Sequence, residues 1–417
     1  MIDGLVIFLL FVVLYAAVAI WLGQRSITMP MFFLALGALT SANALGWINI
    51  SMSSEAVKTL VEVTLALLLF ADSSTLKLHQ LQEDAGLPAR LLGIGLPLTI
   101  FLGGLLVYWI FPGEGIGFAL LIGAILAPTD AALGLPIFNN ERVPVRIRRA
   151  LNVESGLNDG IATPFVLLFT GLAVAEVTQS LSAWLTTAVF EIGMAGLVGA
   201  VLGTLGGWLL STAMKRSLTS RATEQLGTFA LALATYFGSI ALGGNGFIAA
   251  FVAGIVFGAV TRDHFAQPTE LTENNGSFLS LIVWTIFGAI LVPIALSGTT
   301  DLRPIVYAVL SLTVIRMISV ALALRGARLR RDTVLLMGWF GPRGLASVVF
   351  TLLAFLSFEE AQRSSDTLVV VATWTILLSV LAHGLSAGPL STWYARRLAA
   401  AQARHVVLEE LPETGET

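Results

Sequence analysis

The sequence contains no cysteine, which excludes disulfide bonds, thiolate metal sites and cysteine nucleophiles. Charged residues are also scarce: Asp, Glu, Lys and Arg make up 12% of the 417 residues, whereas a soluble domain has roughly 25%. The charges form no basic patch of the kind that binds nucleic acid, so no nucleic-acid partner is expected. The four histidines are scattered without metal-ligand spacing, at His79, His264, His383 and His405. These absences argue against a soluble enzyme or a metalloenzyme, and no cofactor is expected.

Apolar residues dominate what is present: 56% of the chain is hydrophobic, and most of these residues fall in long runs. A helix needs about 20 predominantly apolar residues to cross a bilayer. Thirteen runs approach that length, at roughly residues 4–23, 30–46, 57–74, 91–111, 116–137, 148–173, 184–213, 225–242, 246–261, 277–297, 304–324, 333–356 and 367–393. The sequence therefore predicts an all-α, polytopic protein with about 13 transmembrane helices in a lipid bilayer.

Positive charges are distributed unevenly between the two sides of these spans. When loops are assigned alternately to the two sides, most of the 23 Lys and Arg residues fall on one side. The exceptions are Lys58, Arg303 and Arg363 on the other side, and Arg316 and Arg343 inside spans. Positively charged loops face the cytoplasm. We therefore expect a multi-pass protein of the cell membrane with its N-terminus outside and its C-terminus in the cytoplasm.

Five charged residues fall well inside predicted spans: Asp130, Glu154, Asp159, Arg316 and Arg343. A charge at the centre of a bilayer costs about 2.5–3.5 kcal/mol on insertion scales, so such residues are rarely kept without a role. Buried ion pairs that only fix helix packing are the alternative explanation. Three carboxylates that lie this close together in the sequence favour a functional site instead.

Two spans are interrupted near their middle. The fifth contains Ala127-Pro128-Thr129-Asp130, where the proline removes a backbone donor and frees the carbonyl near residue 124. The twelfth contains Gly338-Trp339-Phe340-Gly341-Pro342-Arg343-Gly344. The twelfth span is the seventh after the fifth, an odd number, so the two run in opposite directions. Paired interruptions in inverted halves are the best sequence indication of a transporter binding site.

This pattern predicts inverted repeats in which the two interrupted helices cross. We expect one transmembrane domain at residues 1–398, with halves of about 1–173 and 225–398 linked by the seventh span. Residues 399–417 are expected to form a short cytoplasmic tail.

The sixth span begins with a polar segment, Asn152-Val153-Glu154-Ser155-Gly156-Leu157-Asn158-Asp159-Gly160. Helical spacing puts Ser155 and Asp159 on one face, and Glu154 and Asn158 on the neighbouring face. Asp159 lies ~17 Å from the start of the span, near the middle of the membrane. Oxygen ligands suit a hard cation, and a carboxylate placed there can hold either a cation or a proton. Competition between the two for one carboxylate is the simplest form of antiport.

Over nearly its whole length the chain resembles the NhaP/NHE branch of the monovalent cation/proton antiporters. The resemblance rests on the thirteen spans, on 127–130, on Glu-Ser-Gly-Leu-Asn-Asp-Gly at 154–160, on Gly-Phe-Ile-Ala-Ala-Phe-Val-Ala-Gly at 246–254 and on Gly-Pro-Arg-Gly at 341–344. The Asn158-Asp159 pair is its most specific element, because the related NhaA-type branch has two aspartates there and moves net charge. The resemblance implies electroneutral one-for-one exchange, a homodimer, and an elevator-like movement of a six-helix core against a fixed dimerisation domain.

The resemblance also implies which residues hold the ion. The implied Na⁺ ligands are Asp130, Asp159, Ser155 and the hydroxyl or backbone of Thr129, with Asn158 beside them. Asp72 lies where some relatives place another carboxylate, and it belongs either to the site or to the exposed end of its span. The implied function is secondary active transport that exchanges Na⁺ or Li⁺ for H⁺ by alternating access, with the cation and the proton competing for Asp159 and Asp130.

Either of two arginines could neutralise Glu154, and their depths in the membrane differ. Arg316 lies ~12 Å from the cytoplasmic end of the eleventh span, and Glu154 lies ~9 Å from the same end of the sixth. Arg343, at the interruption of the twelfth span, lies ~15 Å deep, closer to the level of Asp159. We therefore expect a core ion pair between Glu154 and Arg316, which leaves Asp159 free to titrate.

Glycines recur at spacings of four in the seventh and ninth spans, at Gly199, Gly203, Gly207, Gly254 and Gly258. Small residues at this spacing allow helices to approach closely. We expect tight packing along both spans, within the dimerisation domain.

Three other functions are compatible with parts of this pattern. K⁺/H⁺ exchange on the same fold is an alternative, because ion choice depends on the size of the oxygen cage. A cation channel would not need thirteen spans with inverted, interrupted helices. An intramembrane aspartyl protease would need a Gly-x-Gly-Asp context, which Leu157-Asn158-Asp159-Gly160 does not supply.

Overall fold

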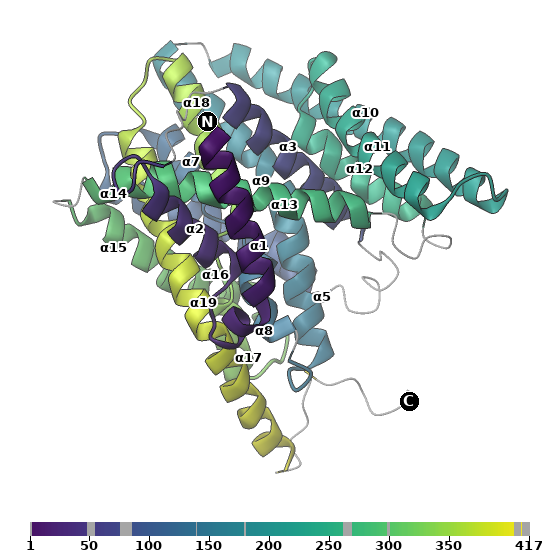
Figure 1. The fold of residues 1–417 in the computed structure, drawn as a ribbon. Helices are drawn as coiled ribbons and strands as arrows, with labels where there is room; N and C mark the ends of the chain where they lie inside the picture. The colour runs from purple at the N-terminus through teal and green to yellow at the C-terminus, as the bar shows by residue number, and fades with distance from the viewer. Residues whose placement is uncertain are drawn as a thin grey trace.

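The computed structural model describes residues 2–47, 55–75, 86–138, 140–178, 181–261, 269–297, 301–403 and 410. Within these ranges the secondary structure is helical, with no β-sheet, as predicted (Figure 1). Each of the predicted spans corresponds to a helix or to a run of helical segments. Those that form a single helix are α1 (Ile2–Gln24), α2 (Met29–Thr40), α3 (Glu55–Ser74), α9 (Val145–Thr178), α10 (Leu181–Lys215), α11 (Arg221–Ala241), α12 (Gly246–Thr261) and α19 (Asp366–Gln402).

Three more predicted spans are helices that contain a π-helical turn. They are α5 (Gly86–Arg90), η1 (Leu91–Gly95) and α6 (Leu96–Ile110); α13 (Glu270–Ile286), η3 (Phe287–Leu291) and α14 (Val292–Ser297); and α15 (Arg303–Leu310), η4 (Ser311–Ile315) and α16 (Arg316–Ala323). The π turns η1 and η4 lie in the spans that precede the two interrupted ones, and α16 packs on η1 while α6 packs on η4. These two π turns therefore take corresponding places before the two interruptions, whereas η3 has no counterpart in α3.

The remaining two spans are interrupted where the sequence predicts. One consists of α7 (Ile116–Ile125), η2 (Ala131–Gly134) and α8 (Leu135–Phe138), with non-helical backbone at 126–130. The other consists of α17 (Arg331–Trp339) and α18 (Leu345–Glu360), with non-helical backbone at 340–344. The helix α7 ends ahead of Pro128, because proline cannot donate to the helix and its predecessor avoids helical angles.

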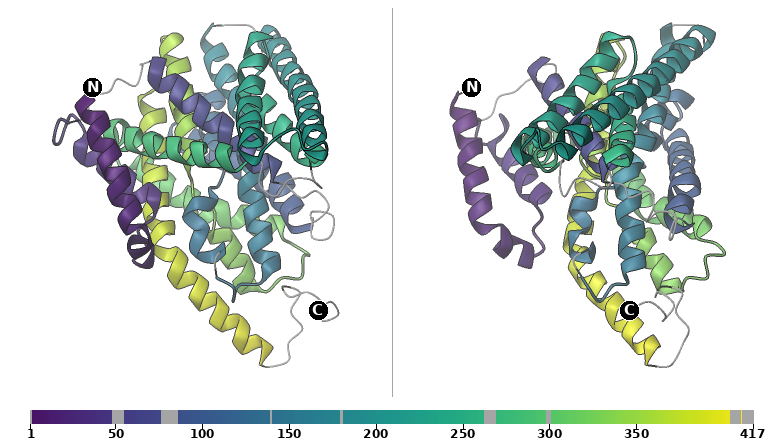
Figure 2. Two further views of the ribbon diagram at one scale, coloured as in Figure 1. Left: turned by 45° about the vertical axis from the view of Figure 1, so that its right-hand side comes forward. Right: turned by 90° about the vertical axis from the view of Figure 1, so that its right-hand side faces the viewer.

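The helices pack in two groups. In one, α3, α10, α11, α12 and α13 contact one another; in the other, α6, α7, α9 and α15 to α19 do so. The groups meet where α9 contacts α3, α10 and α12, and where α18 contacts α3 and α13. The first two helices lie at the edge of the molecule (Figure 2), where the rings of Tyr15 and Phe32 join them.

Glycines let α10 and α12 pack closely. A Cβ atom added to Gly199 would lie 2.6 Å from the carbonyl oxygen of Ala249, and one added to Gly203 would lie 2.7 Å from that of Ala253. Gly254 of α12 faces the backbone of α3 in the same way. The tight packing predicted for the seventh and ninth spans is therefore confirmed, and the partner helices belong to the same chain.

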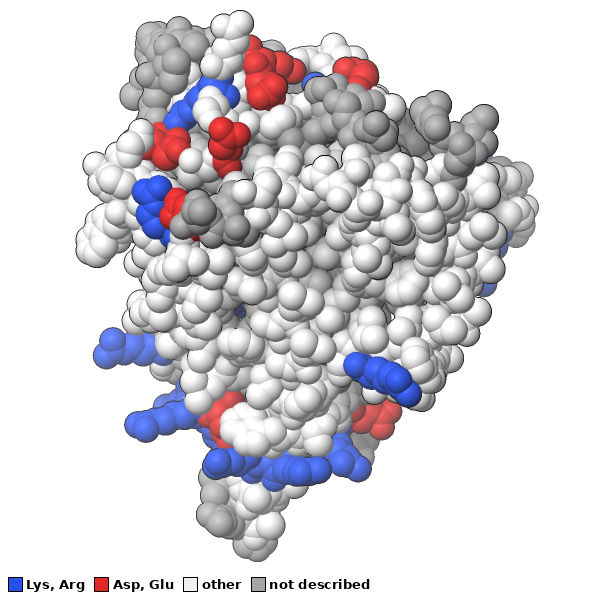
Figure 3. Space-filling view, turned by 60° about the vertical axis from the view of Figure 1, so that its left-hand side comes forward, with Lys and Arg blue, Asp and Glu red and all other residues white. Residues whose placement is uncertain are grey.

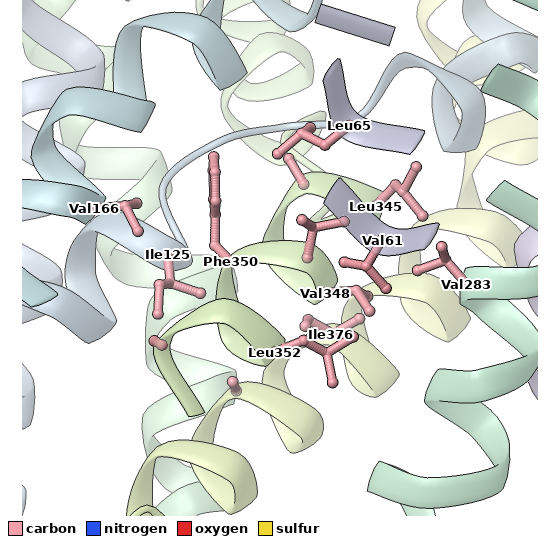
Figure 4. Close-up of a cluster of buried hydrophobic side chains, with 14 of the residues drawn as sticks. Val61, Leu65, Ile125, Val166, Val283, Leu345, Val348, Phe350, Leu352 and Ile376 are labelled. Atoms are coloured by element: carbon pink, nitrogen blue, oxygen red, sulfur yellow. The ribbon is translucent and has the colours of Figure 1, made fainter. Parts of the chain in front are cut away.

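An apolar layer fills the junction between the two groups. Figure 4 shows Val61 and Leu65 of α3 against Leu345 and Val348 of α18, all buried. This layer lies on one side of the interruptions, toward the ends of α3 and α18 at Glu55 and Glu360.

The surface fits a membrane protein. Seven helical runs are long and apolar enough to cross a bilayer by length and composition, and α2, α7 and α12 are shorter apolar helices. A broad uncharged band separates a mostly basic end from an end that carries most of the visible acidic side chains (Figure 3). The basic end lies where α17 begins and α19 ends. The chain is a multi-pass membrane protein.

Candidate functional site

A cavity of about 480 Å³ opens between the two groups of helices, on the side opposite the apolar layer. Its acidic lining residues are Asp72 of α3, Asp130 at the interruption of the fifth span, Asp159 of α9 and Glu273 of α13. Ser155, Asn152 and Arg149 of α9 also line it, as does Thr75 near the mouth. Carboxylates from separate helices therefore face one water-accessible space in the middle of an apolar protein.

Asp130 joins the two interruptions. Its backbone N–H donates to the carbonyl oxygen of Pro342 at 2.8 Å. Its carboxylate accepts from two helix starts: Oδ1 from the N–H of Ala132 at 2.7 Å, and Oδ2 from the N–H of Leu345 at 3.1 Å. A negative charge is stabilised at helix N-termini, so η2 and α18 both hold this carboxylate in place.

Gly344 makes this arrangement possible. A Cβ atom at that position would overlap the Cβ and the carboxylate of Asp130. The glycine of the Gly-Pro-Arg-Gly segment is therefore a steric requirement of the site, since any side chain would separate the two interruptions.

Arg343 donates hydrogen bonds to backbone carbonyls of the first interruption, on the side where α7 ends. Its Nη1 donates to the carbonyl oxygens of Ala127 at 2.7 Å and Pro128 at 3.3 Å. The hydroxyl of Ser347 donates to the carbonyl of Ile125 at 2.7 Å. The sequence predicted a freed carbonyl near residue 124. The carbonyls bonded from outside the helix are instead those of residues 125, 127, 128 and 129, because α7 ends before the proline is reached.

The polar start of α9 has the two faces predicted from its spacing. Ser155 and Asp159 line the cavity, whereas Glu154 and Asn158 are buried on the neighbouring face. Among the described residues, the carboxylate of Asp159 has no hydrogen-bond donor; only its backbone oxygen is bonded, by the hydroxyl of Thr163. A cation or a proton could therefore bind this carboxylate without displacing an internal partner.

Thr129 and Asn158 do not line the cavity. The Nδ2 of Asn158 donates to the carbonyl oxygen of Thr129 at 3.1 Å and to its Oγ1 at 2.6 Å. The Oγ1 of Thr129 lies 3.2 Å from the Oγ of Ser155. Thr129 was expected as an ion ligand and Asn158 beside the ion; the structure places both directly behind Ser155, with Thr129 in contact with its hydroxyl.

Glu154 pairs with Arg316, as its depth in the span predicts. The Oε1 of Glu154 lies 2.7 Å from the Nη1 of Arg316, and both side chains are buried. Arg316 reaches this place because Gly341 has no side chain to block its guanidinium. Arg343 forms no ion pair among the described residues, and its contacts are to backbone oxygens.

Asp72 and Glu273 complete the acidic lining from the other group of helices. The structure places Asp72 in the cavity wall and not at a lipid-exposed span end. Glu273 could not be identified from the sequence, because it lies in the polar first turn of α13, before the apolar run begins. Only the packing of α13 against α3 brings it to the cavity.

The chemistry of this site is that of oxygen ligands and mobile protons. In the described part of the chain, no cluster of three or more His, Asp or Glu side chains is placed to hold a resident metal ion. The carboxylates share a cavity without closing into a rigid cage. Such a site suits an exchangeable hard cation better than a structural one.

Comparisons with known proteins agree with this description. Residues 6–393 match the family described as "Sodium/hydrogen exchanger, transmembrane". The chain is similar to the K(+)/H(+) antiporter NhaP of Alkalimonas amylolytica, with 24% identity over 87% of this chain and 62% of the relative. It is also similar to the Na(+)/H(+) antiporter ApNhaP of Aphanothece halophytica, with 25% identity over 81% of this chain and 66% of the relative. The chain thus spans less than two thirds of the length of these curated relatives.

A solved structure shares the fold. The sodium proton antiporter MjNhaP1 from Methanocaldococcus jannaschii at pH 8 superposes with a TM-score of 0.76 at 20% identity, over 94% of this chain and 99% of that chain. The predicted all-helical membrane fold is confirmed by this likeness.

Proposed function

This chain belongs to the sodium/hydrogen exchanger family, and we propose that it exchanges Na⁺ or Li⁺ for H⁺ across the cell membrane. The observation that carries the proposal is the cavity that reaches both Asp159 and Asp130. A carboxylate that has no internal hydrogen-bond donor and lies in apolar surroundings can be neutralised in two ways. It can bind a cation, or it can bind a proton. Because one excludes the other, the site couples their movements.

The proposed ion site consists of Asp159, Asp130 and the hydroxyl of Ser155, with Asp72 across the cavity. Asp130 is held by two helix N-termini, so it supplies a fixed oxygen at the crossing point. Asp159 has no such partner, and its carboxylate is the group that binds the cation and the proton in turn. Thr129 and Asn158 act through Ser155, and the ion pair of Glu154 with Arg316 keeps a further carboxylate from competing for the cation.

Access on one side supports alternating access as the mechanism. The cavity opens toward Thr75, Arg149 and Glu273, and the apolar layer of Figure 4 closes the opposite side. The cavity also lies between the two groups of helices. In the proposed movement, the group containing α7, α9 and α17 to α19 slides against the group containing α3 and α10 to α13. The proposal includes this division into two moving groups. It also includes the two inverted halves within residues 1–398 and the assembly of two chains into a homodimer.

The positive-inside rule supports an inward-facing cavity. The cavity opens at the end where arginines gather, which gives a cytoplasmic C-terminus and an external N-terminus. A cysteine-accessibility assay suits this chain, because it has no native cysteine. A single cysteine at Thr75 should react with an impermeant reagent only from the cytoplasmic side, and reaction from outside would reverse the proposed orientation.

K⁺ is the second candidate cation. The relative from Alkalimonas amylolytica is described as a K(+)/H(+) antiporter, which favours considering this ion. A proteoliposome assay decides between the candidates: an imposed gradient of Na⁺, Li⁺ or K⁺ should move the internal pH, and the ion with the lowest half-maximal concentration is the substrate. If no gradient of Na⁺, Li⁺ or K⁺ changes the internal pH, the exchange function is refuted.

A further inference from the structure

His383 of α19 lies at the interruption of the twelfth span, away from the ion cavity. Its side chain is fully buried. The Nε2 atom lies 2.9 Å from the carbonyl oxygen of Trp339, the last residue of α17. The Nδ1 atom lies 3.1 Å from the Oγ of Ser379 and 2.9 Å from the carbonyl oxygen of the same residue, one turn earlier. The imidazole therefore bridges the end of α17 and a hydroxyl of α19.

The partners of the ring determine where its proton lies. Both ring nitrogens face a carbonyl oxygen, which can only accept, but Nδ1 also faces the hydroxyl of Ser379. Nε2, which has no such second partner, therefore carries the proton and donates to Trp339. In a neutral ring Nδ1 is then the acceptor, and the hydroxyl of Ser379 is the donor that can serve it. This tautomer supplies a second donor to the carbonyl at the C-terminal end of α17, which also accepts from the backbone N–H of Gly341 at 2.8 Å.

The same hydroxyl reaches the start of α18. The backbone N–H of Arg343 donates to the Oγ of Ser379 at 2.6 Å. The residue before Arg343 is Pro342, whose carbonyl accepts from Asp130, and two residues after it the N–H of Leu345 donates to the carboxylate of Asp130. His383 and Ser379 thus hold both ends of the segment that orients Asp130.

The first half of the chain has a comparable arrangement. In α9, Ser155 and Asp159 are four residues apart and lie beside the interruption at Thr129. In α19, Ser379 and His383 have the same spacing beside the interruption at 340–344. The second half therefore has an imidazole bonded to the backbone where the first half has a carboxylate open to the cavity.

We propose that His383, acting through Ser379, is a positioning residue for ion exchange, which fixes the second interruption so that Asp130 is held at the cation site. His383 does not line the cavity and is not an ion ligand. The proposal rests on the exchange function above. It predicts that losing the bond to Trp339 weakens cation affinity more than maximal rate, because the geometry of Asp130 is disturbed while Asp159 is intact.

Two amide substitutions separate the hydrogen bond from simple packing. In His383→Gln the side-chain amide reaches about the position of Nε2 and can still donate to Trp339. In His383→Asn it reaches only about the position of Nδ1, so this bond is lost. In proteoliposomes, H383N should raise the half-maximal cation concentration about tenfold, the effect expected for the loss of one buried hydrogen bond, while H383Q should stay within about threefold of wild type.

Ser379→Ala should act like H383N, and Thr375→Val is its matched control. The hydroxyl of Thr375 lies one turn before Ser379 on the same helix, and among the described residues it bonds only to the carbonyl of Val371. The valine variant should therefore leave the half-maximal cation concentration unchanged. Equal affinities for H383N, H383Q and wild type would overturn the proposal, as would equal weakening in both amide variants.

Amide hydrogen exchange gives a readout that does not depend on transport. Residues 341–345 should exchange faster in H383N than in H383Q, with α10 and α12 unchanged in both. If the wild type moves no protons with any cation, the exchange function fails, but this comparison still tests the positioning role. Equal protection of 341–345 in the two variants would contradict it.

Discussion

The backbone N–H of Asp130 donates to the carbonyl oxygen of Pro342, and this bond joins the two interrupted helices at their crossing. Each interruption leaves backbone groups that lipid cannot satisfy. Each half supplies partners for the other: Arg343 bonds the carbonyls at 127 and 128, and Asp130 bonds the amide of Leu345. The ion site is thus built on the groups that make two broken helices tolerable in a membrane.

Asp159→Asn and Asp130→Asn should both abolish exchange but should differ in stability. Asp159 has no internal donor, so its amide variant should unfold close to the wild-type temperature. In Asp130→Asn, an NH₂ group replaces one of two oxygens that accept from backbone N–H groups, which strands a buried donor at a cost of about 1–3 kcal/mol. Thermal unfolding in detergent, beside proteoliposome transport, measures both effects.

The contrast between the two variants is the informative result. Residual cation-dependent proton movement in Asp159→Asn would remove Asp159 as the shared carboxylate. Equal stability of both variants would show that the bonds of Asp130 to Ala132 and Leu345 contribute little.

Gly344→Ala should abolish exchange and lower the unfolding temperature. The added Cβ would overlap Asp130, so the crossing must separate. Gly196→Ala in α10 is the matched control, because a Cβ there meets nothing within 4 Å. An active, stable Gly344→Ala protein would mean that the crossing is looser than the structure shows.

Glu154 and Arg316 should show strong coupling in a double-mutant cycle of thermal stability. Removing either partner leaves an uncompensated buried charge, which costs about 3–5 kcal/mol. Removing both should cost much less than the two single losses together. The matching cycle between Glu154 and Arg343 is the control, and coupling there, with none to Arg316, would contradict the pairing.

The sequence was most informative where one residue type has a strong local consequence. Pro128 placed the first interruption, and the spacing of Glu154, Ser155, Asn158 and Asp159 assigned the two faces of α9. It was less informative where function depends on helices that meet only in the folded protein. The amide of Asn158 donates to both the carbonyl and the hydroxyl of Thr129, which therefore faces Asn158 and not the cavity. The spacing of residues in the sequence does not predict this orientation.

Histidine shows the same limit of sequence reasoning. His383 has no metal-ligand spacing and looks isolated in the sequence, because its partner Trp339 lies in another helix. Glu273 appears to be an ordinary first-turn acid until α13 packs on α3. Local rules predicted the helices and their interruptions, whereas these contacts depend on crossing angles that a single sequence does not specify.

The last prediction concerns charge balance, and it starts from Asn158. A single exchangeable carboxylate, Asp159, gives one cation for one proton, so an imposed membrane potential should leave the exchange rate unchanged at fixed ion gradients.

Asn158→Asp should not make the protein electrogenic. Asn158 is buried and donates to two oxygens of Thr129, so a carboxylate there would face a carbonyl oxygen that can only accept, and it would have no access to the cavity. The variant should instead be unstable and inactive. Proteoliposomes in which valinomycin and a K⁺ gradient set the potential measure the first claim, once the cation assay has shown that K⁺ itself is not exchanged. A strong voltage dependence in wild type, or a stable and voltage-dependent Asn158→Asp, would show that a second carboxylate, such as Asp72 in the cavity wall, carries charge through the cycle.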